Sequence, residues 1–419
     1  SIEAIKLIAK SFLATRKIDD ARLYFNKALN IQSNDYEVIK DLGNTYQAVG
    51  DVNNAKNYYK KAIEINSSYA PALTNLGSIE LCIGNKQEAL SLLIKATESD
   101  SQLAVAWGNL ANGYLQLEKK QEAEIACQKS IELNPNLFNS HFLLANILIG
   151  EQKRKEAEAS LRKAIELNPD FVNAHLTLGA VLKELGQLQE AENACRKAIE
   201  LSPNLFNSHF LLANILIEQK KLQEAEQPLR KTIELKLDFF QAHSALGGLL
   251  GKLGKLQDAE LFARKAIELN PHCATDHSNL GNILKDLGKL QEAELFARKA
   301  IELNPHCATA HSNLGNILKN LGKLQDAELS TRKAIELNPS LGEAYFNLGN
   351  ILKANFKLDE AIYNFKKAQE HKIDKNKCLV GIGEALLDQG NHIDGIRNLR
   401  EGEGVIIFDI EKKSCFSKI

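Results

Sequence analysis

The chain has 419 residues, 44% of them hydrophobic and 25% charged, with 52 lysines and arginines against 53 acidic residues and a formal net charge of −1. A nearly neutral chain has no field that would gather a polyanion, so we expect no nucleic-acid partner and no direct membrane insertion. No apolar run approaches the roughly 20 residues of a membrane helix, and the first residues lack the uninterrupted apolar stretch of a secretory signal, so we expect a cytoplasmic location.

A 34-residue pattern runs without insertion from residue 2 to residue 375. Its clearest copies are residues 274–307 and 308–341, whereas the first copy, residues 2–35, is degenerate. The eleven copies begin at Ile2, Tyr36, Ala70, Ala104, Phe138, Val172, Phe206, Phe240, Ala274, Ala308 and Gly342. A fixed period of this kind predicts one elongated tandem array in which each unit contacts only its neighbours.

Each unit is expected to be a helix hairpin. In the copy that begins at Ala274, apolar residues fall at helical spacing over residues 277–287 and again over residues 291–303. Gly288 separates the two patterns and allows a left-handed turn, and Pro305 ends the second helix. One hairpin cannot bury both apolar stripes, so stacked copies must share a continuous core.

The copy at residues 206–239 departs from the pattern twice. Pro228 falls inside its second helix, where it removes an amide donor and crowds a carbonyl, and Leu237 replaces the proline of the turn. These departures predict a kinked or split helix, and we expect the array to be least stable and to flex at this unit.

After residue 375 the pattern fades. Residues 376–404 read as a degenerate twelfth unit, whose second helix is weakened because Gly395 and Gly402 replace alanines. Residues 405–419 read as two short strands around a polar turn. Two interpretations of this last segment stay open: a strand-like tail or hairpin at the end of the array, or the start of a further domain.

Searches for chemistry are negative. The sequence has no phosphate-binding glycine loop, no paired metal-ligand motif and no nucleophile elbow, so we expect neither an enzyme nor a cofactor. The seven cysteines show no paired spacing, and several recur with the repeat, which favours packing residues over disulfides. Six histidines stand at successive 34-residue steps: His141, His175, His209, His243, His277 and His311. Neighbouring helices lie roughly 8 to 10 Å apart, too far to share one zinc ion, so packing is the favoured role.

Several residues in the copy at 274–307 match a known family. Leu280, Gly281, Leu284 and Ala293 stand where the tetratricopeptide repeat has its leucines and small residues, and Pro305 stands at its terminal proline. The unit therefore resembles that family. The resemblance implies an all-α, right-handed superhelical solenoid of helix-turn-helix repeats, and it implies that the first helix of each hairpin lines a concave groove.

Asparagines recur at the sixth and ninth places of the units, which the resemblance assigns to the groove. They are Asn44, Asn75, Asn109, Asn112, Asn146, Asn214, Asn279, Asn282, Asn313, Asn316, Asn347 and Asn350. An amide both donates and accepts, so a ladder of amides can pair with the backbone of an extended peptide. The wording Asn-Leu-Gly-Asn resembles the asparagine ladder in the tetratricopeptide arm of O-linked N-acetylglucosamine transferases. The alternative is that asparagine is merely a polar residue carried along by duplication.

Two further groups are predicted to contact a peptide. Phe142 and Phe210 predict an apolar middle stretch of the groove, unless they fold under neighbouring helices and belong to the core. Lys285, Lys319 and Lys353 recur at the twelfth place and favour an acidic ligand, with a solvated lysine row as the alternative.

The sequence thus predicts a non-catalytic protein–protein interaction scaffold that binds extended peptide segments of unknown identity in its groove. The alternative is a substrate-presenting arm of an enzyme whose catalytic domain follows residue 419.

Overall fold

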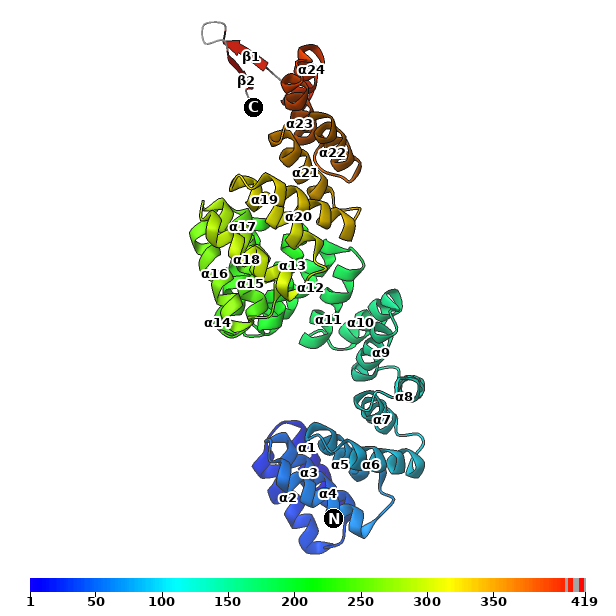
Figure 1. The fold of residues 1–419 in the computed structure, drawn as a ribbon. Coiled ribbons are helices and arrows are strands. Elements are labelled where there is room, and N and C mark those ends of the chain that lie inside the picture. Colours follow the sequence, from blue (N-terminus) through cyan, green and yellow to red (C-terminus); the bar gives the residue numbers. More distant parts are fainter. Residues whose placement is uncertain (404–405, 410–413, 418–419) are drawn as a thin grey trace. The chain divides into compact units, whose positions relative to one another are not determined.

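The computed structural model describes residues 1–403 in full, together with the backbone of residues 406–409 and 414–417. Within this part of the chain, 24 α-helices follow one another as twelve hairpins, and two short strands come last (Figure 1). The chain divides into two compact units, Ser1–Pro203 and Asn204–Ile419. The fold class is all-α, as the sequence predicted.

The first compact unit holds six hairpins. They are α1 (Ile2–Ala14) with α2 (Ile18–Ile31), α3 (Tyr36–Ala48) with α4 (Val52–Ile65), α5 (Ala70–Cys82) with α6 (Lys86–Ser99), α7 (Ala104–Gln116) with α8 (Lys120–Leu133), α9 (Phe138–Gly150) with α10 (Arg154–Leu167), and α11 (Val172–Glu184) with α12 (Leu188–Leu201).

The second compact unit holds the other six hairpins and the strands. They are α13 (Phe206–Glu218) with α14 (Leu222–Leu235), α15 (Phe240–Lys252) with α16 (Leu256–Leu269), α17 (Ala274–Asp286) with α18 (Leu290–Leu303), α19 (Ala308–Asn320) with α20 (Leu324–Leu337), α21 (Gly342–Ala354) with α22 (Leu358–Glu370), α23 (Lys375–Asp388) with α24 (His392–Glu403), and β1 (Ile406–Asp409) with β2 (Ser414–Ser417).

The turn inside each hairpin needs one residue with a positive φ. Gly288 supplies it with a φ of 77°, as the sequence predicted, and Gly254 and Gly322 do the same in neighbouring units. Glu118 and Phe356 adopt this conformation without being glycine, with φ values of 60° and 57°. The packing of the two helices therefore imposes the turn, and glycine only lowers its cost.

In two hairpins, a glycine of the first helix faces a large aromatic ring of the second helix. A Cβ added at Gly43 would lie 2.6 Å from the Tyr59 ring, and one added at Gly349 would lie 2.8 Å from the Phe365 ring. Both rings are fully buried. Glycine at this place is therefore required by the close approach of the two helices.

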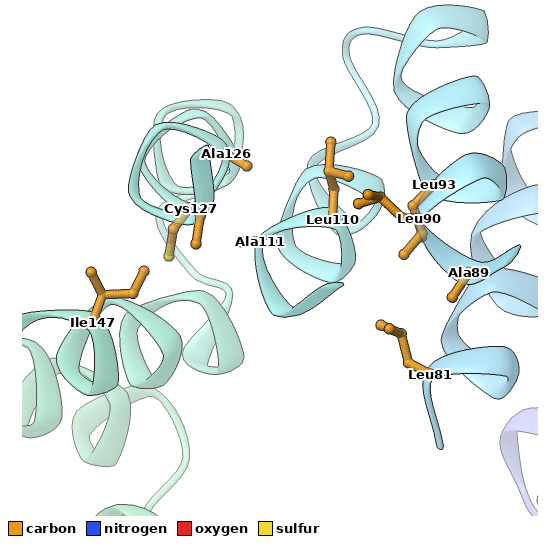
Figure 2. Packing of buried hydrophobic residues seen from close by; sticks show 10 residues of the cluster. Leu81, Ala89, Leu90, Leu93, Leu110, Ala111, Ala126, Cys127 and Ile147 are labelled. Carbon is orange, nitrogen blue, oxygen red and sulfur yellow. The ribbon is translucent and has the colours of Figure 1, made fainter. Parts of the chain in front are cut away.

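Neighbouring hairpins share one core, as expected of units that cannot bury their own stripes. Figure 2 shows this in the first compact unit, where Leu81 of α5, Leu90 and Leu93 of α6, Leu110 of α7 and Ile147 of α9 belong to one buried cluster. A helix in such a cluster packs within its own hairpin and against the neighbouring hairpin, so the stability of the fold depends on contacts between units as well as within them.

The predicted split of the second helix at Pro228 is wrong, whereas the alternative, a kink, stays a prediction. Helix α14 runs as one continuous α-helix of 14 residues with Pro228 buried inside it. One turn later, the Thr232 hydroxyl donates to the Pro228 carbonyl at 2.8 Å. Packing on both sides holds the helix together where its own propensity would not. Whether this unit flexes stays a prediction.

The last unit is better formed than its glycines suggested. Helix α24 extends through Gly395 and Gly402 to Glu403. A Cβ added at Gly395 would lie 2.8 Å from the Leu387 side chain, so glycine there allows a close helix contact. Strand β1 pairs antiparallel with β2. Whether these strands form a tail or open a further domain stays a prediction, and residues 404–405, 410–413 and 418–419 of that segment lie outside the described residues.

Candidate peptide-binding surface

All twelve asparagines of the predicted ladder lie on the first helices of their hairpins, and all are half-buried. Five lie in the first compact unit and seven in the second. Half-burial fits a side chain that is held in place by neighbours and still reaches solvent. Their role in binding stays a prediction, but the hydrogen bonds around them show how several are oriented.

In the first compact unit, Asn44 and Asn75 of successive repeats are bonded to each other. The Asn75 amide donates to the Asn44 Oδ1 at 2.9 Å. The Tyr59 hydroxyl, which has one hydrogen to donate, lies 2.8 Å from the same oxygen and 2.6 Å from the Gln47 Oε1. Burial raises the pKa of Tyr59, so its hydroxyl stays protonated and able to donate. The Asn44 Nδ2 donates to Asp41 at 3.2 Å. This network fixes two amides in one orientation across a repeat boundary.

In the second compact unit, the asparagines are held by serines of the preceding repeat. The Asn313 amide donates to the Ser278 hydroxyl at 2.9 Å, and the Asn347 amide donates to the Ser312 hydroxyl at 3.0 Å. Each bond uses one N–H, and an amide carries two donors and a carbonyl that can accept. The pairing therefore orients each side chain and leaves it further capacity for a ligand.

The serines were missed by sequence reasoning. Serines stand at the fifth place of three successive units, as Ser244, Ser278 and Ser312, and the last two directly precede Asn279 and Asn313. This regularity was a usable signal, but the bond itself joins residues 35 positions apart and appears only when the hairpins stack. Ser244 makes a different bond and donates to Asp276, which is 2% exposed.

A hollow of 500 Å³ lies among the first helices α15 and α17. Its lining includes Ser244, Gly248 and Gly251 from α15, and Asn279 and Asn282 from α17. Nothing lies within 4 Å of the position that a Cβ of Gly248 would take. Because Gly248 and Gly251 have no side chains, the hollow is deeper beside the predicted amides Asn279 and Asn282.

The predicted lysine row lies on α17, α19 and α21. Lys285 pairs with Asp286 at 3.1 Å, and Lys353 pairs with Glu384. Burial lowers the pKa of Lys319, and the positive charges of Lys353 and Lys285 lower it further. The three ammonium groups therefore repel one another electrostatically, and an anionic ligand at this place would reduce the repulsion.

The predicted apolar residues are half-buried, and each packs on the phenylalanine that ends its own copy of the repeat. Phe142 packs edge-to-face on Phe171 with ring centroids 4.9 Å apart, and Phe210 packs in the same way on Phe239 at 5.0 Å. This ring contact at the end of each copy thus covers part of each ring. The remaining exposed surface is the only part that a ligand could contact.

The recurring histidines contact backbone carbonyls in the turns between repeats. The Nε2 atoms of His175 and His277 lie 2.8 and 2.9 Å from the carbonyls of Pro169 and Pro271, six residues earlier. Trp107 makes the same contact through its indole N–H. A carbonyl only accepts, so each imidazole donates through Nε2. Among the residues with described side chains, no group of three or more His, Cys, Asp and Glu could hold a metal ion.

The described cysteines are free thiols. Cys127 and Cys195 are buried, which raises their pKa to about 12, and the Cys127 thiol donates to the Ser140 carbonyl at 3.0 Å. They act as packing residues, as the sequence indicated. No described helix has both the length and the apolar character needed to cross a membrane.

Family models match nearly the whole array. Residues 7–245 match the model described as the C-terminal domain of cilia and flagella-associated protein 70. Residues 274–307 and 308–341 match one model described as a tetratricopeptide repeat, and residues 240–273 and 342–370 match another. No curated protein matches the chain.

Solved structures show the same fold. The crystal structure of the APC/C hetero-tetramer Cut9–Hcn1 matches at 14% identity with a TM-score of 0.52, over 98% of this chain and 95% of that chain. A tetratricopeptide repeat protein from Parabacteroides merdae ATCC 43184 matches at 18% identity with a TM-score of 0.52, over 59% of this chain and 98% of that chain. Both likenesses show an all-α superhelical repeat fold. The likeness to O-linked N-acetylglucosamine transferases rests on sequence wording alone.

Proposed function

The chain belongs to the tetratricopeptide-repeat family, because more than half of its length matches the C-terminal domain family of cilia and flagella-associated protein 70. From this we propose that it is a non-catalytic scaffold that binds an extended peptide. The peptide lies along the first helices of the second compact unit. Its backbone pairs with the asparagine side chains, and its acidic side chains lie near the lysine row.

One observation carries the proposal: Asn313 and Asn347 are held by serines in the same way, one repeat apart. Neighbouring helices lie about 8–10 Å apart. An extended chain advances about 3.4 Å per residue, so one amide per repeat meets the peptide backbone about every third residue. Backbone pairing of this kind tolerates many sequences. The groove therefore selects an extended conformation more than a particular set of side chains.

Charge adds a preference. The lysine row comprises Lys285, Lys319 and Lys353 on successive first helices, and the lowered pKa of Lys319 reflects its burial and the positive charge on both sides of it. A peptide carboxylate beside Lys319 would favour the protonated amine. We therefore expect acidic peptides to bind better at low ionic strength than at high ionic strength.

The test starts from a random-peptide display library selected on the wild-type chain. The variant Asn279→Ala, Asn313→Ala and Asn347→Ala should bind the selected peptides more weakly, by about 1 kcal/mol for each backbone hydrogen bond lost. Fluorescence anisotropy with the labelled peptides measures the affinity. The proposal is wrong if the triple variant binds every selected peptide as tightly as the wild type.

The matched control changes three amides on the second helices of three successive repeats, two of which also carry Asn279 and Asn313. Gln257, Gln291 and Gln325 are exposed on α16, α18 and α20. Their replacement by alanine removes the same chemical groups and should leave both the affinity and the fold unchanged. Equal losses in the two triple variants would attribute the effect to general destabilisation.

A second candidate function is the substrate-presenting arm of an enzyme whose catalytic domain follows residue 419. The Asn-Leu-Gly-Asn motif that begins at residues 279, 313 and 347 favours this second candidate. Reading the gene's full open frame tests it, because several hundred further residues would support the arm. In either case the free cysteines suit a reducing compartment, and we propose a cytoplasmic location.

A further inference from the structure

The second helices of two repeats carry a phenylalanine in a recurring setting. The Phe262 ring lies 5.9 Å from the His243 ring, and the Arg230 guanidinium lies 5.5 Å from its centroid. One repeat later, the Phe296 ring lies 5.8 Å from the His277 ring and 5.6 Å from the Arg264 guanidinium. Both repeats therefore place a phenyl ring between an imidazole and the guanidinium of the preceding repeat.

The next repeat keeps the surroundings and lacks the ring. Ser330 stands 34 residues after Phe296, His311 stands 34 after His277, and Arg298 stands 34 after Arg264. A cavity of 630 Å³ opens here between α18, α19 and α20, and these three residues, Ser330, His311 and Arg298, are part of its lining. Its volume lies within the range of about 300–1,000 Å³ that is typical of ligand pockets.

The lining is shaped for an apolar ring. Leu314 and Leu318 of α19 are buried in the cavity wall, and Ile301 of α18 also lines the cavity. Leu329 stands at the rim with 73% of its surface exposed. The Ser330 hydroxyl donates to the His311 carbonyl at 3.1 Å, so the small polar side chain is satisfied without entering the cavity.

The arginine is also less engaged than in the preceding repeat. Arg264 pairs with Glu260 at 2.8 Å and with Glu292 at 2.6 Å, and its side chain is 40% exposed. Arg298 pairs with Glu294 at 2.8 Å and is 55% exposed. Asp326, which is one methylene shorter, stands in the cavity lining where the preceding repeat has Glu292. The guanidinium plane is therefore more open to an incoming ring.

The same replacement recurs one repeat later. Asn364 stands in the place of the phenylalanine, and a second cavity of 630 Å³ is lined by Arg332, Tyr345, Leu348 and Tyr363. Tyr363 is 59% exposed at its rim. Two neighbouring repeats thus share a vacated ring position on the second helices, and the residues that line the two cavities include none of the predicted asparagines.

We propose that the cavity between α18, α19 and α20 is a docking site for an aromatic side chain of a partner polypeptide. The occupant is inferred from the chain itself, because Phe262 and Phe296 fill the equivalent space with a ring held by a histidine and an arginine. Aromatic side chains combine a large apolar area with attraction to a cation above the ring. The partner inserts this ring beside Leu329, independently of any peptide on the first helices.

The test uses a photoreactive probe, N-acetyl-4-(trifluoromethyldiazirinyl)-phenylalanine amide, and maps the labelled peptides by mass spectrometry. We expect labelling of the segment around Leu329 and Lys333. Ser330→Phe supplies the ring from within and should reduce this labelling about tenfold, a loss that corresponds to excluding a ligand from its pocket. It should not lower the melting temperature, since the preceding repeats accommodate the same ring.

Two controls keep the proposal falsifiable. Phe296→Ser vacates the site in the preceding repeat and should create new labelling around Leu295. Photoleucine amide carries an aliphatic reactive group and should label the cavity weakly. The proposal is overturned if Ser330→Phe leaves the labelling unchanged or lowers the melting temperature sharply, if Phe296→Ser creates no new label, or if photoleucine amide labels the site as strongly as the aromatic probe.

Discussion

At the scale of single residues, small side chains decide how closely the helices approach. The Phe365 ring shows this most clearly because it lies between two glycines: a Cβ added at Gly349 would be 2.8 Å from the ring, and one added at Gly381 would be 2.7 Å away. Such distances leave the ring no room to move aside. Glycine in the middle of a helix is otherwise unfavourable, so its presence here marks a packing requirement.

Gly349→Ala should therefore destabilise the chain, by about 1–3 kcal/mol, because the added methyl group overpacks a full core. Urea unfolding followed by circular dichroism measures the loss. Gly248→Ala is the matched control, since Gly248 also lies within a first helix but has nothing within 4 Å of the added Cβ. It should be neutral or stabilising, by up to about 1 kcal/mol. Equal losses at both positions would contradict the packing account.

The residue scale also shows what sequence reading could not supply. The repeat identified the asparagines, the histidines and the turn glycines, because each recurs at a fixed place. It did not identify the partners Ser278 and Ser312, because those bonds form only between stacked repeats. Nor did it reveal the cavity beside Ser330, which depends on comparing that residue with Phe296 in three dimensions.

At the scale of helices, ion pairs join four second helices, α14, α16, α18 and α20, to the turn of the next repeat. Glu260 accepts from Lys289 at 2.8 Å and from Arg264 of its own helix at 2.8 Å. Hydrogen bonds from Lys289, followed by those from Arg264, lower the pKa of the Glu260 carboxyl. Glu226 and Glu294 are held in the same way.

Glu328 completes the series. Burial raises its pKa, but hydrogen bonds from Lys357 and Arg332 outweigh that effect, and the pKa ends below its ordinary value. Each of these four carboxyl groups has a lower pKa in the folded chain than in the unfolded chain. Their contribution to stability is therefore present above pH 4.5, the ordinary value, and is lost as the pH falls through the lower folded values.

The melting temperature should accordingly fall as the pH is lowered below about 4.5. A variant with glutamine at Glu226, Glu260, Glu294 and Glu328 should start lower at pH 7 and lose less on acidification. Each partly exposed pair contributes about 0.2–1 kcal/mol, so the combined effect is measurable by calorimetry. If the melting temperatures of the variant and the wild type fall in parallel with pH, these ion pairs do not cause the acid sensitivity.

The helix scale contains the clearest failure of sequence reasoning. Pro228 predicted a break, but α14 continues through it. The cost of proline is a property of an isolated helix, whereas Pro228 and Leu229 are buried against neighbouring helices that fix the backbone. The sequence pattern therefore predicted where the helices begin and end better than it predicted the effect of one unfavourable residue.

At the scale of the whole chain, the 34-residue period was enough to predict an all-α repeat array, because each hairpin needs only its neighbours to bury its apolar stripes. The candidate site was less predictable. The period places the asparagines on the first helices, but a ligand is needed to show which of them act. The two proposed sites share helix α19 but use different residues of it, so they can be tested separately.

The most direct measurement replaces one residue at a time with a photo-crosslinking amino acid and asks which helix touches the selected peptide. Asn316 lies on the first helix α19, and Gln291 lies on the second helix α18. Binding along the first helices predicts that the peptide crosslinks from position 316 and does not crosslink from position 291. Crosslinking from position 291 with none from position 316 would contradict the account.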